Sequence, residues 1–386
     1  MRGLYAFSSA QGGLSLIELM VASAVGLLIM LAVLTLHLNV SRTNDEMAKS
    51  NALIENGRFA MQLLQNDIAH AGFWDTYVPE FDDLTLSTVP TDVPASLPDP
   101  CIAFSATWNS SSLLGIPLQV YSSLAAMPST CSSLLPNYKS GTDILVVRHA
   151  HTVPTCLSGQ TEGCEEEVGG KLYFQASRCA NSTIDTASYR LADSGLDLHA
   201  RDCTTIAPKR RYISDIYYIR DYSVNAGDGI PTLMRSEFDL ESGTVRAISP
   251  VALIEGVDGF HVDLGIDRVS NAGVDVISDA NASKRWTAAV LWADAKNLTS
   301  PINRGDGVPD VFVHCSGVCS VDELANVVAV KVSLLMRSLQ ATPGYQDAKS
   351  YTLGSQTIGA ANDAFKRHVF STVVRLNNVS GRRETP

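Results

Sequence analysis

The sequence predicts an α+β protein, in which a long N-terminal helix packs on an antiparallel β-sheet domain that carries a disulfide-rich insertion. Three observations predict this fold. Only one formal charge falls between Leu14 and Leu38. An amphipathic pattern follows, and no proline interrupts the chain before Pro79. After residue 209, apolar segments of strand length are joined by turns rather than by helices, which favours antiparallel pairing.

The apolar segment is long enough to cross a membrane as a helix. Its 25 residues, from Leu14 to Leu38, would extend roughly 37 Å. The small residues Gly12 and Gly13 precede this segment, whereas a cleavable secretory signal has its small-residue site after a shorter apolar core. A cut at these glycines would leave the membrane helix on the mature protein. Glu18 is unexpected here, because an ionised carboxylate in hydrocarbon costs a few kcal/mol.

The segment after Leu38 is predicted to continue the same helix with one apolar face. Four apolar residues recur every seven positions, namely Met47, Ile54, Met61 and Ile68. Gly72 is expected to end the helix, because glycine readily adopts the left-handed conformation that follows a helix C-terminus. One helix from residue 14 to about residue 70, roughly 85 Å long, is therefore predicted.

The overall composition suits a folded protein and excludes some functions. Of 386 residues, 18% are charged and 45% are hydrophobic, which argues against a disordered chain. The formal net charge of −11 argues against binding nucleic acid through a basic surface. We therefore expect no nucleic-acid partner.

The eight cysteines all follow the apolar segment, and their even number is typical of disulfides in an oxidising compartment. They are Cys101, Cys131, Cys156, Cys164, Cys179, Cys203, Cys315 and Cys319. The closest pair, Cys315 and Cys319, lies beside His314, but no second pair is near enough for a typical zinc motif. Disulfides are expected, with free thiols or a metal as alternatives. Pairing of sequence neighbours is the simplest of the 105 connectivities, and the choice among them stays open.

The segment "GGLSLIELMV" (12–21) resembles the processing site of type IV prepilins and pseudopilins. Later segments resemble PilW-type minor pilins, at residues 55–74, 253–267, 326–338 and 367–378. The resemblance implies that a prepilin peptidase cuts between Gly13 and Leu14 and methylates the new terminus. It also implies that Glu18 pairs with the amino terminus of the adjacent subunit, which sets the register of subunits and recruits them. Two features depart from the family, since Leu14 replaces the usual phenylalanine and the leader has few basic residues.

The motifs and the composition together divide the chain into five parts. They are a leader (1–13), the transmembrane half of the helix (14–38), its amphipathic half (39–72), a cysteine-rich variable region (73–209) and a pilin-like antiparallel sheet head (210–386). Strands are expected at residues 143–150, 171–177, 210–223, 231–239, 259–267, 326–338 and 367–378. The remainder of the cysteine-rich region is expected to be irregular.

Motifs for catalysis are missing from the sequence, so no enzyme and no cofactor are expected. It contains no G-x-S-x-G, H-E-x-x-H, P-loop or G-x-G-x-x-G pattern. The histidines of "RHAH" (148–151) are expected on a solvated strand face. Two Asp-Gly loops, at 227–231 and 305–309, are predicted turns. The second offers a weak alternative, a calcium site at Asn303, Asp306 and Asp310, although it lacks the EF-hand pattern.

The resemblance implies a minor pilin of a type IV pilus that primes assembly at or near the tip. It implies insertion in the inner membrane with the head in the periplasm, and transfer to the pilus on assembly. The implied partners are a prepilin peptidase, other minor pilins, the major pilin and the inner-membrane assembly platform. Two alternatives stay open, a type II secretion pseudopilin and a pilus-anchored adhesin whose residues 75–210 bind a receptor.

Overall fold

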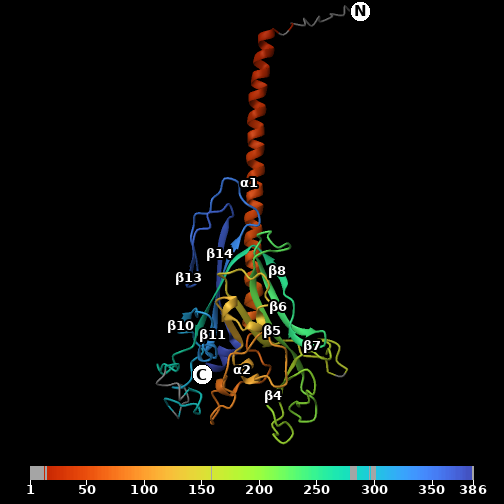
Figure 1. The fold of residues 1–386 in the computed structure, drawn as a ribbon, viewed down its shortest axis with the longest axis vertical. Coiled ribbons are helices and arrows are strands. Elements are labelled where there is room, and N and C mark those ends of the chain that lie inside the picture. The colour runs from red at the N-terminus through yellow and green to blue at the C-terminus, as the bar shows by residue number, and fades with distance from the viewer. Residues whose placement is uncertain are drawn as a thin grey trace, which may run out of the picture. The chain divides into compact units, whose positions relative to one another are not determined.

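The computed structural model describes residues 13, 15–157, 159–278, 285–294, 296 and 301–384. The chain divides into two compact units, Met1–Asn51 and Ala52–Pro386. Helix α1 (Leu16–His70) begins in the first unit and ends in the second (Figure 1). Its bounds agree with the predicted helix, because no residue in it breaks the backbone hydrogen-bond ladder.

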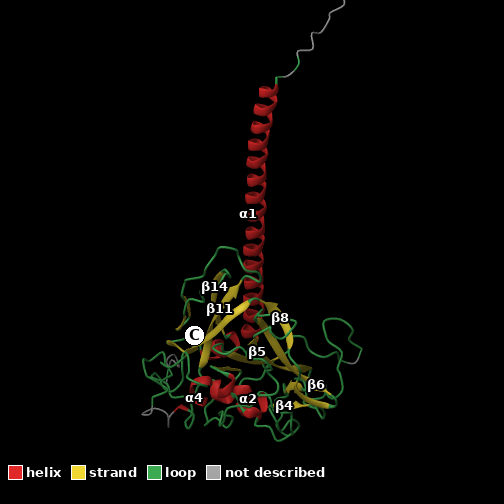
Figure 2. Ribbon diagram, turned by 45° about the horizontal axis from the view of Figure 1, so that its top comes forward, coloured by secondary structure: helices red, strands yellow, loops and turns green. Residues whose placement is uncertain are grey.

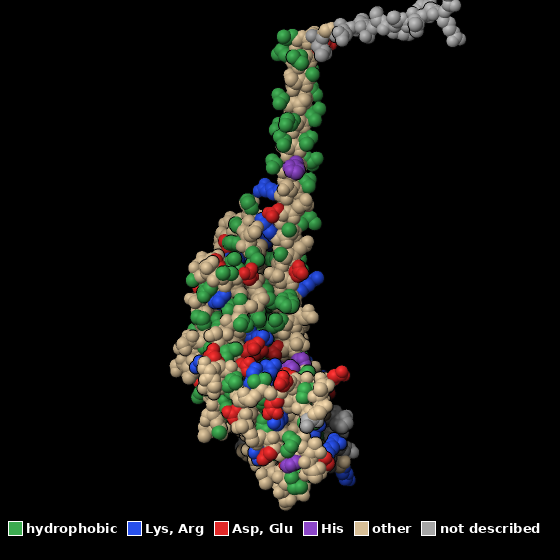
Figure 3. Space-filling view, turned by 90° about the vertical axis from the view of Figure 1, so that its right-hand side faces the viewer, with side chains coloured by type: hydrophobic (Ala, Val, Ile, Leu, Met, Phe, Trp, Pro, Cys, Tyr) green, Lys and Arg blue, Asp and Glu red, His purple; other side chains and the backbone are tan. Residues whose placement is uncertain are grey.

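In the first unit, helix α1 is apolar on every side. Large hydrophobic side chains between Leu16 and Val40 are exposed, and Figure 3 shows them in green along this stretch. Among the described residues, α1 is the one helix with the length and hydropathy needed to cross a membrane. Side chains of this kind are stable in lipid or against other apolar helices, and not in water.

In the second unit, helix α1 buries one stripe of side chains in the protein core. The stripe consists of Leu53, Gly57, Ala60, Met61, Leu64 and Ile68. These residues follow the helical period, and of the predicted repeat Met61 and Ile68 are buried whereas Met47 and Ile54 are exposed. Gly57 allows strand β14 (Arg367–Arg375) to approach closely, because a Cβ atom there would lie 2.3 Å from the Phe370 ring. Gly72 has a φ of 75° and follows the helix end, as predicted.

Eight antiparallel strands form the larger sheet. They are β1 (Leu118–Tyr121), β2 (Ile144–Ala150), β3 (Tyr173–Ala176), β4 (Tyr189–Ala192), β5 (Lys209–Arg220), β6 (Thr232–Glu241), β7 (Thr244–Ala247) and β8 (Val251–Glu255). The order β1-β2-β5-β3-β4 describes one path through the sheet, and β6 pairs with β5, β7 and β8. Strand β5 is therefore central, with β2, β3 and β6 all bonded to it.

A second antiparallel sheet has the order β10-β9-β11-β14. Its strands are β9 (Val257–Ile266), β10 (Val311–Val313), β11 (Val327–Arg337) and β14 (Arg367–Arg375), and a hairpin of β12 (Tyr351–Leu353) and β13 (Gln356–Ile358) precedes β14. Figure 2 shows the short helices around the sheets. These are α2 (Ser110–Gly115), α4 (Val321–Leu324) and α5 (Asn377–Arg383), with the 3-10 turns η1 (Glu80–Asp82), η2 (Leu124–Ala126) and η3 (Ser129–Cys131).

Strand β2 of the larger sheet is buried on both faces. On β2, Leu145 and Val147 belong to the core that contains the stripe of α1 and the strands β9 and β11. The alternate residues, Ile144 and Val146, belong to a second core around Trp74. Strands covered on both faces have continuous apolar runs rather than alternation. This explains the unbroken hydrophobic run at the start of β2.

The predicted fold class, α+β with a long helix and antiparallel strands, is confirmed, and each of the seven predicted strands is present. The region 73–209 was expected as an outward insertion, yet it contributes β1–β4 to the same sheet as the head. Strands β2 and β3 both pair with β5, so strand pairing crosses residue 209. The sequence did not predict β1 or β4, each of which is four residues long.

Candidate functional site

At its N-terminus, helix α1 carries a reciprocal hydrogen-bonded pair between Ser15 and Glu18. The Ser15 backbone N–H donates to Glu18 Oε2 at 2.9 Å, and the Glu18 N–H donates to Ser15 Oγ at 3.4 Å. This arrangement is a capping box, for which Ser-x-x-Glu before an apolar run is the sequence signature. The sequence contained this signature, but the interpretation of Glu18 concentrated on its charge.

The predicted cleavage site lies next to this capping box. Gly13 is described and exposed, whereas Leu14 lies outside the described residues. Processing at this bond therefore stays a prediction. The positive end of the helix dipole favours the Glu18 carboxylate. A carboxylate has several acceptor positions, so Glu18 keeps the capacity to accept a bond from a further cation.

All eight cysteines form disulfides between sequence neighbours. The pairs are Cys101–Cys131, Cys156–Cys164, Cys179–Cys203 and Cys315–Cys319. This connectivity is the simplest of those that the sequence allows, although the sequence did not choose it over the others. Cys156–Cys164 closes a loop between β2 and β3, whereas the segments closed by Cys101–Cys131 and Cys179–Cys203 contain β1 and β4. Each bridge restricts the unfolded chain. The fourth closes a short loop between β10 and α4.

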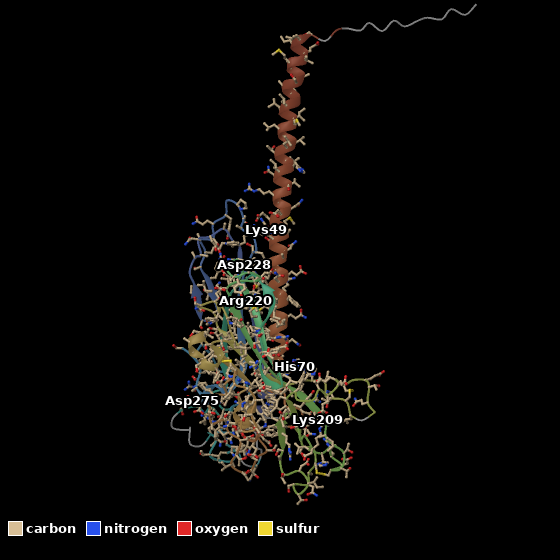
Figure 4. All side chains as sticks on the ribbon, turned by 45° about the vertical axis from the view of Figure 1, so that its right-hand side comes forward. Lys49, His70, Lys209, Arg220, Asp228 and Asp275 are labelled. Atoms are coloured by element: carbon tan, nitrogen blue, oxygen red, sulfur yellow. A yellow bond between two sulfur atoms is a disulfide. The ribbon has the colours of Figure 1, made fainter. Side chains whose placement is uncertain are left out.

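A polar cavity of about 360 Å³ lies at the C-terminal end of helix α1 in the second unit. Its lining includes Asp67 and His70 of α1, His149 of β2 and Asp215 of β5. Figure 4 labels His70 at this end of the helix. His149 Nε2 lies 2.9 Å from Asp67 Oδ1, and Asp215 lies 3.7 Å from Arg235. Charged side chains that line the cavity therefore connect helix α1 to the larger sheet.

The prediction that "RHAH" lies on a solvated strand face is wrong. Arg148 and His149 are both buried, and Arg148 donates to the carbonyl oxygen of Ile116. His149 has a carboxylate partner, Asp67, that is 82 residues away in sequence. The prediction failed because β2 is an inner strand with both faces covered.

The charged groups of the cavity give the protein a pH-dependent stability. Burial alone would lower the pKa of His149, but the hydrogen bond and charge of Asp67 raise it above its ordinary value. Burial raises the pKa of Asp215, and the nearby charge of Asp67 adds to this increase. A raised folded-state pKa favours the protonated form in both cases, so both contributions are lost as the pH rises.

We expect these two groups to lower the free energy of unfolding as the pH rises from about 4 to above 8, because the ordinary pKa of aspartate is about 3.9 and that of histidine about 6.5, and burial raises the pKa of Asp215 to about 8. The Asp215→Asn variant cannot ionise at this position, so its stability relative to the native protein should increase with pH. Denaturant unfolding of the detergent-solubilised native protein and variant at several pH values measures the two free energies of unfolding. If the difference in the free energy of unfolding between the variant and the native protein did not change with pH, the pH dependence could not be assigned to Asp215.

The second Asp-Gly loop is organised by an aspartate outside the predicted calcium set. Asp267 accepts hydrogen bonds from the backbone N–H groups of Asp306 and Gly307. Asp310 accepts from the backbone of Arg268 and Val269. Asn303 bonds to the backbone of residues 289 and 291, and Asp306 accepts from Val308 N–H. The loop has internal partners for its oxygen atoms, and calcium binding remains an untested alternative.

Three groups of described residues bring together side chains of the types that bind metals. Two of these groups contain disulfide cysteines, whose sulfur atoms are not thiolates. The third consists of Asp143, His261 and His314. Burial alone would raise the pKa of Asp143, but the adjacent His261 and His314 side chains and the backbone N–H of Val262 outweigh it and lower the pKa. No local motif connects these residues, so the sequence did not predict the group.

Residues 216–378 match the family model of PilW, which is described as type IV pilus-assembly protein W. Over these residues the chain resembles PilW. The predicted resemblance is thereby confirmed. Among solved structures, the type IV-like pilin TTHA1219 from Thermus thermophilus matches with 12% identity over 85% of this chain and 96% of that chain, at a TM-score of 0.33. This score is too low to carry an argument. No curated protein matches the sequence.

The PilW match covers the second part of β5, the strands from β6 to β14 and the start of α5. It includes His261 and His314, whereas Glu18 and six of the eight cysteines precede it. The PilW match and the apolar N-terminal helix together support a type IV pilus-related pilin that associates with a membrane.

Proposed function

We propose that this protein is a minor pilin of a type IV pilus, which primes pilus assembly with other minor pilins at or near the tip. The observation that carries the proposal is the apolar half of α1, which opens with Glu18 in a chain that also matches PilW. The protein acts by association and not by catalysis. Its partners are the prepilin peptidase, other minor pilins, the major pilin and the inner-membrane assembly platform.

The apolar segment and the disulfide-bonded head indicate how the chain is oriented in the membrane. The apolar segment is inserted in the inner membrane, and the head lies in the periplasm before assembly. Four disulfides support this location, because such bonds persist in oxidising compartments. After cleavage between Gly13 and Leu14, the same apolar segment packs against the helices of other subunits in the fibre.

The strand pairing within the head favours a scaffold role over an adhesin. A receptor-binding module is expected to form a separate lobe, whereas β1–β4 extend the sheet of the head. The PilW match favours a pilus over a type II secretion pseudopilin. Both alternatives share the same processing site and differ in the partners of the head.

We expect the protein extracted from membranes to begin at N-methylated Leu14. Intact mass measurement and N-terminal sequencing test this directly. The Gly13→Val variant should remain unprocessed, and its fold should be unaffected because a Cβ atom at Gly13 has no atom within 4 Å. A native protein that still begins at Met1 would overturn the proposal. The protein would then be interpreted as a membrane-anchored periplasmic protein.

A further inference from the structure

The cluster of Asp143, His261 and His314 lies where the two sheets meet. Asp143 immediately precedes β2 of the larger sheet, His261 lies on β9, and His314 immediately follows β10. The Asp143 backbone N–H donates to the carbonyl oxygen of Phe260, and Val262 N–H donates to Asp143 Oδ2. These backbone contacts hold Asp143 beside His261, at the junction of the two sheets.

Their ligand atoms converge at distances that suit a small cation. Asp143 Oδ1 lies 3.1 Å from His314 Nε2, and Asp143 Oδ2 lies 3.1 Å from His261 Nδ1. All three ligand atoms lie within 4.8 Å of one another. Tetrahedral Zn²⁺ with bonds of ~2.0–2.2 Å separates its ligand atoms by roughly 3.3 Å. Small side-chain movements would therefore bring the three atoms around one ion.

The orientation of His261 is fixed by a second carboxylate. Its Nε2 lies 3.1 Å from Asp263 Oδ1 and 3.0 Å from Ser355 Oγ. The Ser355 hydroxyl donates its proton to Asp263 Oδ1 at 2.6 Å, so Nε2 of His261 must carry the proton that faces these oxygens. Carboxylates commonly orient metal-binding histidines in this way and fix the tautomer.

The other nitrogen of His261 is left without a hydrogen bond. His261 is 1% exposed, and its Nδ1 has no aligned partner although the Asp143 carboxylate is 3.1 Å away. With the proton on Nε2, a neutral ring presents the Nδ1 lone pair to a carboxylate, which is also an acceptor. Two buried acceptors that face each other are unfavourable, and a cation between them removes the conflict.

We propose that Asp143, His261 and His314 bind a Zn²⁺ ion. Two imidazole nitrogens and one carboxylate oxygen form a ligand set that favours Zn²⁺ over Ca²⁺ or Mg²⁺, which prefer oxygen ligands. His314 is the partly exposed member, so the ion enters past its ring and water completes the coordination. The ion joins the start of β2 to β9 and β10, and it therefore stabilises the junction of the two sheets.

Zinc binding can be measured on the full-length, tag-free protein in detergent. After chelator treatment, one equivalent of Zn²⁺ should bind per chain, as elemental analysis measures it. The midpoint of thermal unfolding should rise when the ion is restored, because the ion binds the folded state. Co²⁺ in its place should give the absorption of a tetrahedral site without a sulfur charge-transfer band, since all cysteines form disulfides.

The His314→Ala variant should bind Zn²⁺ at least roughly tenfold more weakly. The His368→Ala variant is the matched control, because His368 is exposed on β14 and outside the cluster, and its affinity should be unchanged. The proposal would be overturned if the native protein took up no stoichiometric Zn²⁺ and showed no tetrahedral Co²⁺ spectrum. The cluster would then be a network of ion pairs without a metal. Equal affinities of the His314→Ala variant and native protein would also overturn the proposal. The measurements on native protein hold even if a variant fails to fold.

Discussion

The Glu18→Ala variant is expected to be processed normally but to be almost absent from sheared pili. Glu18 is the only formally charged side chain between Leu14 and Leu38. In the proposed fibre it would be surrounded by apolar helices, where a charge is tolerated when it is paired with an opposite charge. We propose that the new amino terminus of an adjacent subunit supplies that charge. Without the carboxylate, the amino terminus of the adjacent subunit has no charge to pair with, and the axial register of the incoming subunit is no longer fixed by this pair.

The capping box supplies a control that separates charge from helix stability. In the Ser15→Ala variant, the cap is lost but the carboxylate is kept, at a cost of about 1 kcal/mol to the helix. This variant should still enter the pilus. In contrast, the Glu18→Gln variant retains an acceptor for Ser15 N–H but loses the charge, and it should be excluded like Glu18→Ala. Immunoblots of sheared and membrane fractions measure the distribution. Incorporation of Glu18→Gln at the native level would show that charge pairing is not the mechanism.

The structural features that the sequence predicted are local ones. Helix α1 was predicted from an uninterrupted apolar and amphipathic pattern, and Gly72 from the conformation that ends a helix. The predicted strands were those with long apolar runs, such as β2 and β11. In each case the deciding interactions join residues that are near in sequence, or depend on burial that composition alone indicates.

The features that the sequence did not predict depend on contacts between distant residues. His149 meets Asp67 across 82 residues, and His314 meets Asp143 across 171. No spacing rule relates such residues, because the approach of β2 to α1 and to β10 is set by the topology of the sheets. The extension of the sheet by residues 73–209 was missed for a similar reason. Strands β1 and β4 are short and were not predicted, and pairing with β2 and β3 makes them strands.

A buried network around Arg383 in helix α5 is a further long-range feature, and it leads to the second large expected effect. Arg383 Nε donates to Asp82 Oδ1 at 2.9 Å, and Nη1 donates to Asp267 Oδ2 at 3.1 Å and to Asn326 Oδ1 at 2.8 Å. Nη2 donates to the carbonyl oxygen of Ala325 at 2.8 Å. Arg383 is 2% exposed, and Asp82 lies 301 residues away in sequence. One guanidinium group thus connects η1, the segment after β9, the end of α4 and the C-terminal helix.

The Arg383→Met variant is expected to lose about 3–5 kcal/mol of the free energy of unfolding, because it removes the cation that the buried carboxylates of Asp82 and Asp267 share and leaves Asp82 with the more distant Arg382, 3.8 Å away. Arg375→Met is the matched control. Arg375 pairs with Glu384, and both side chains are about half exposed, so its loss should change stability by less than about 0.5 kcal/mol. Denaturant unfolding with the disulfides intact measures both variants. The loss in Arg383→Met should decrease at acidic pH, where the two carboxylates accept protons and no longer need a cation. Equal stabilities of the two variants at neutral pH would mean that the network contributes packing alone and that the charge of Arg383 is not required.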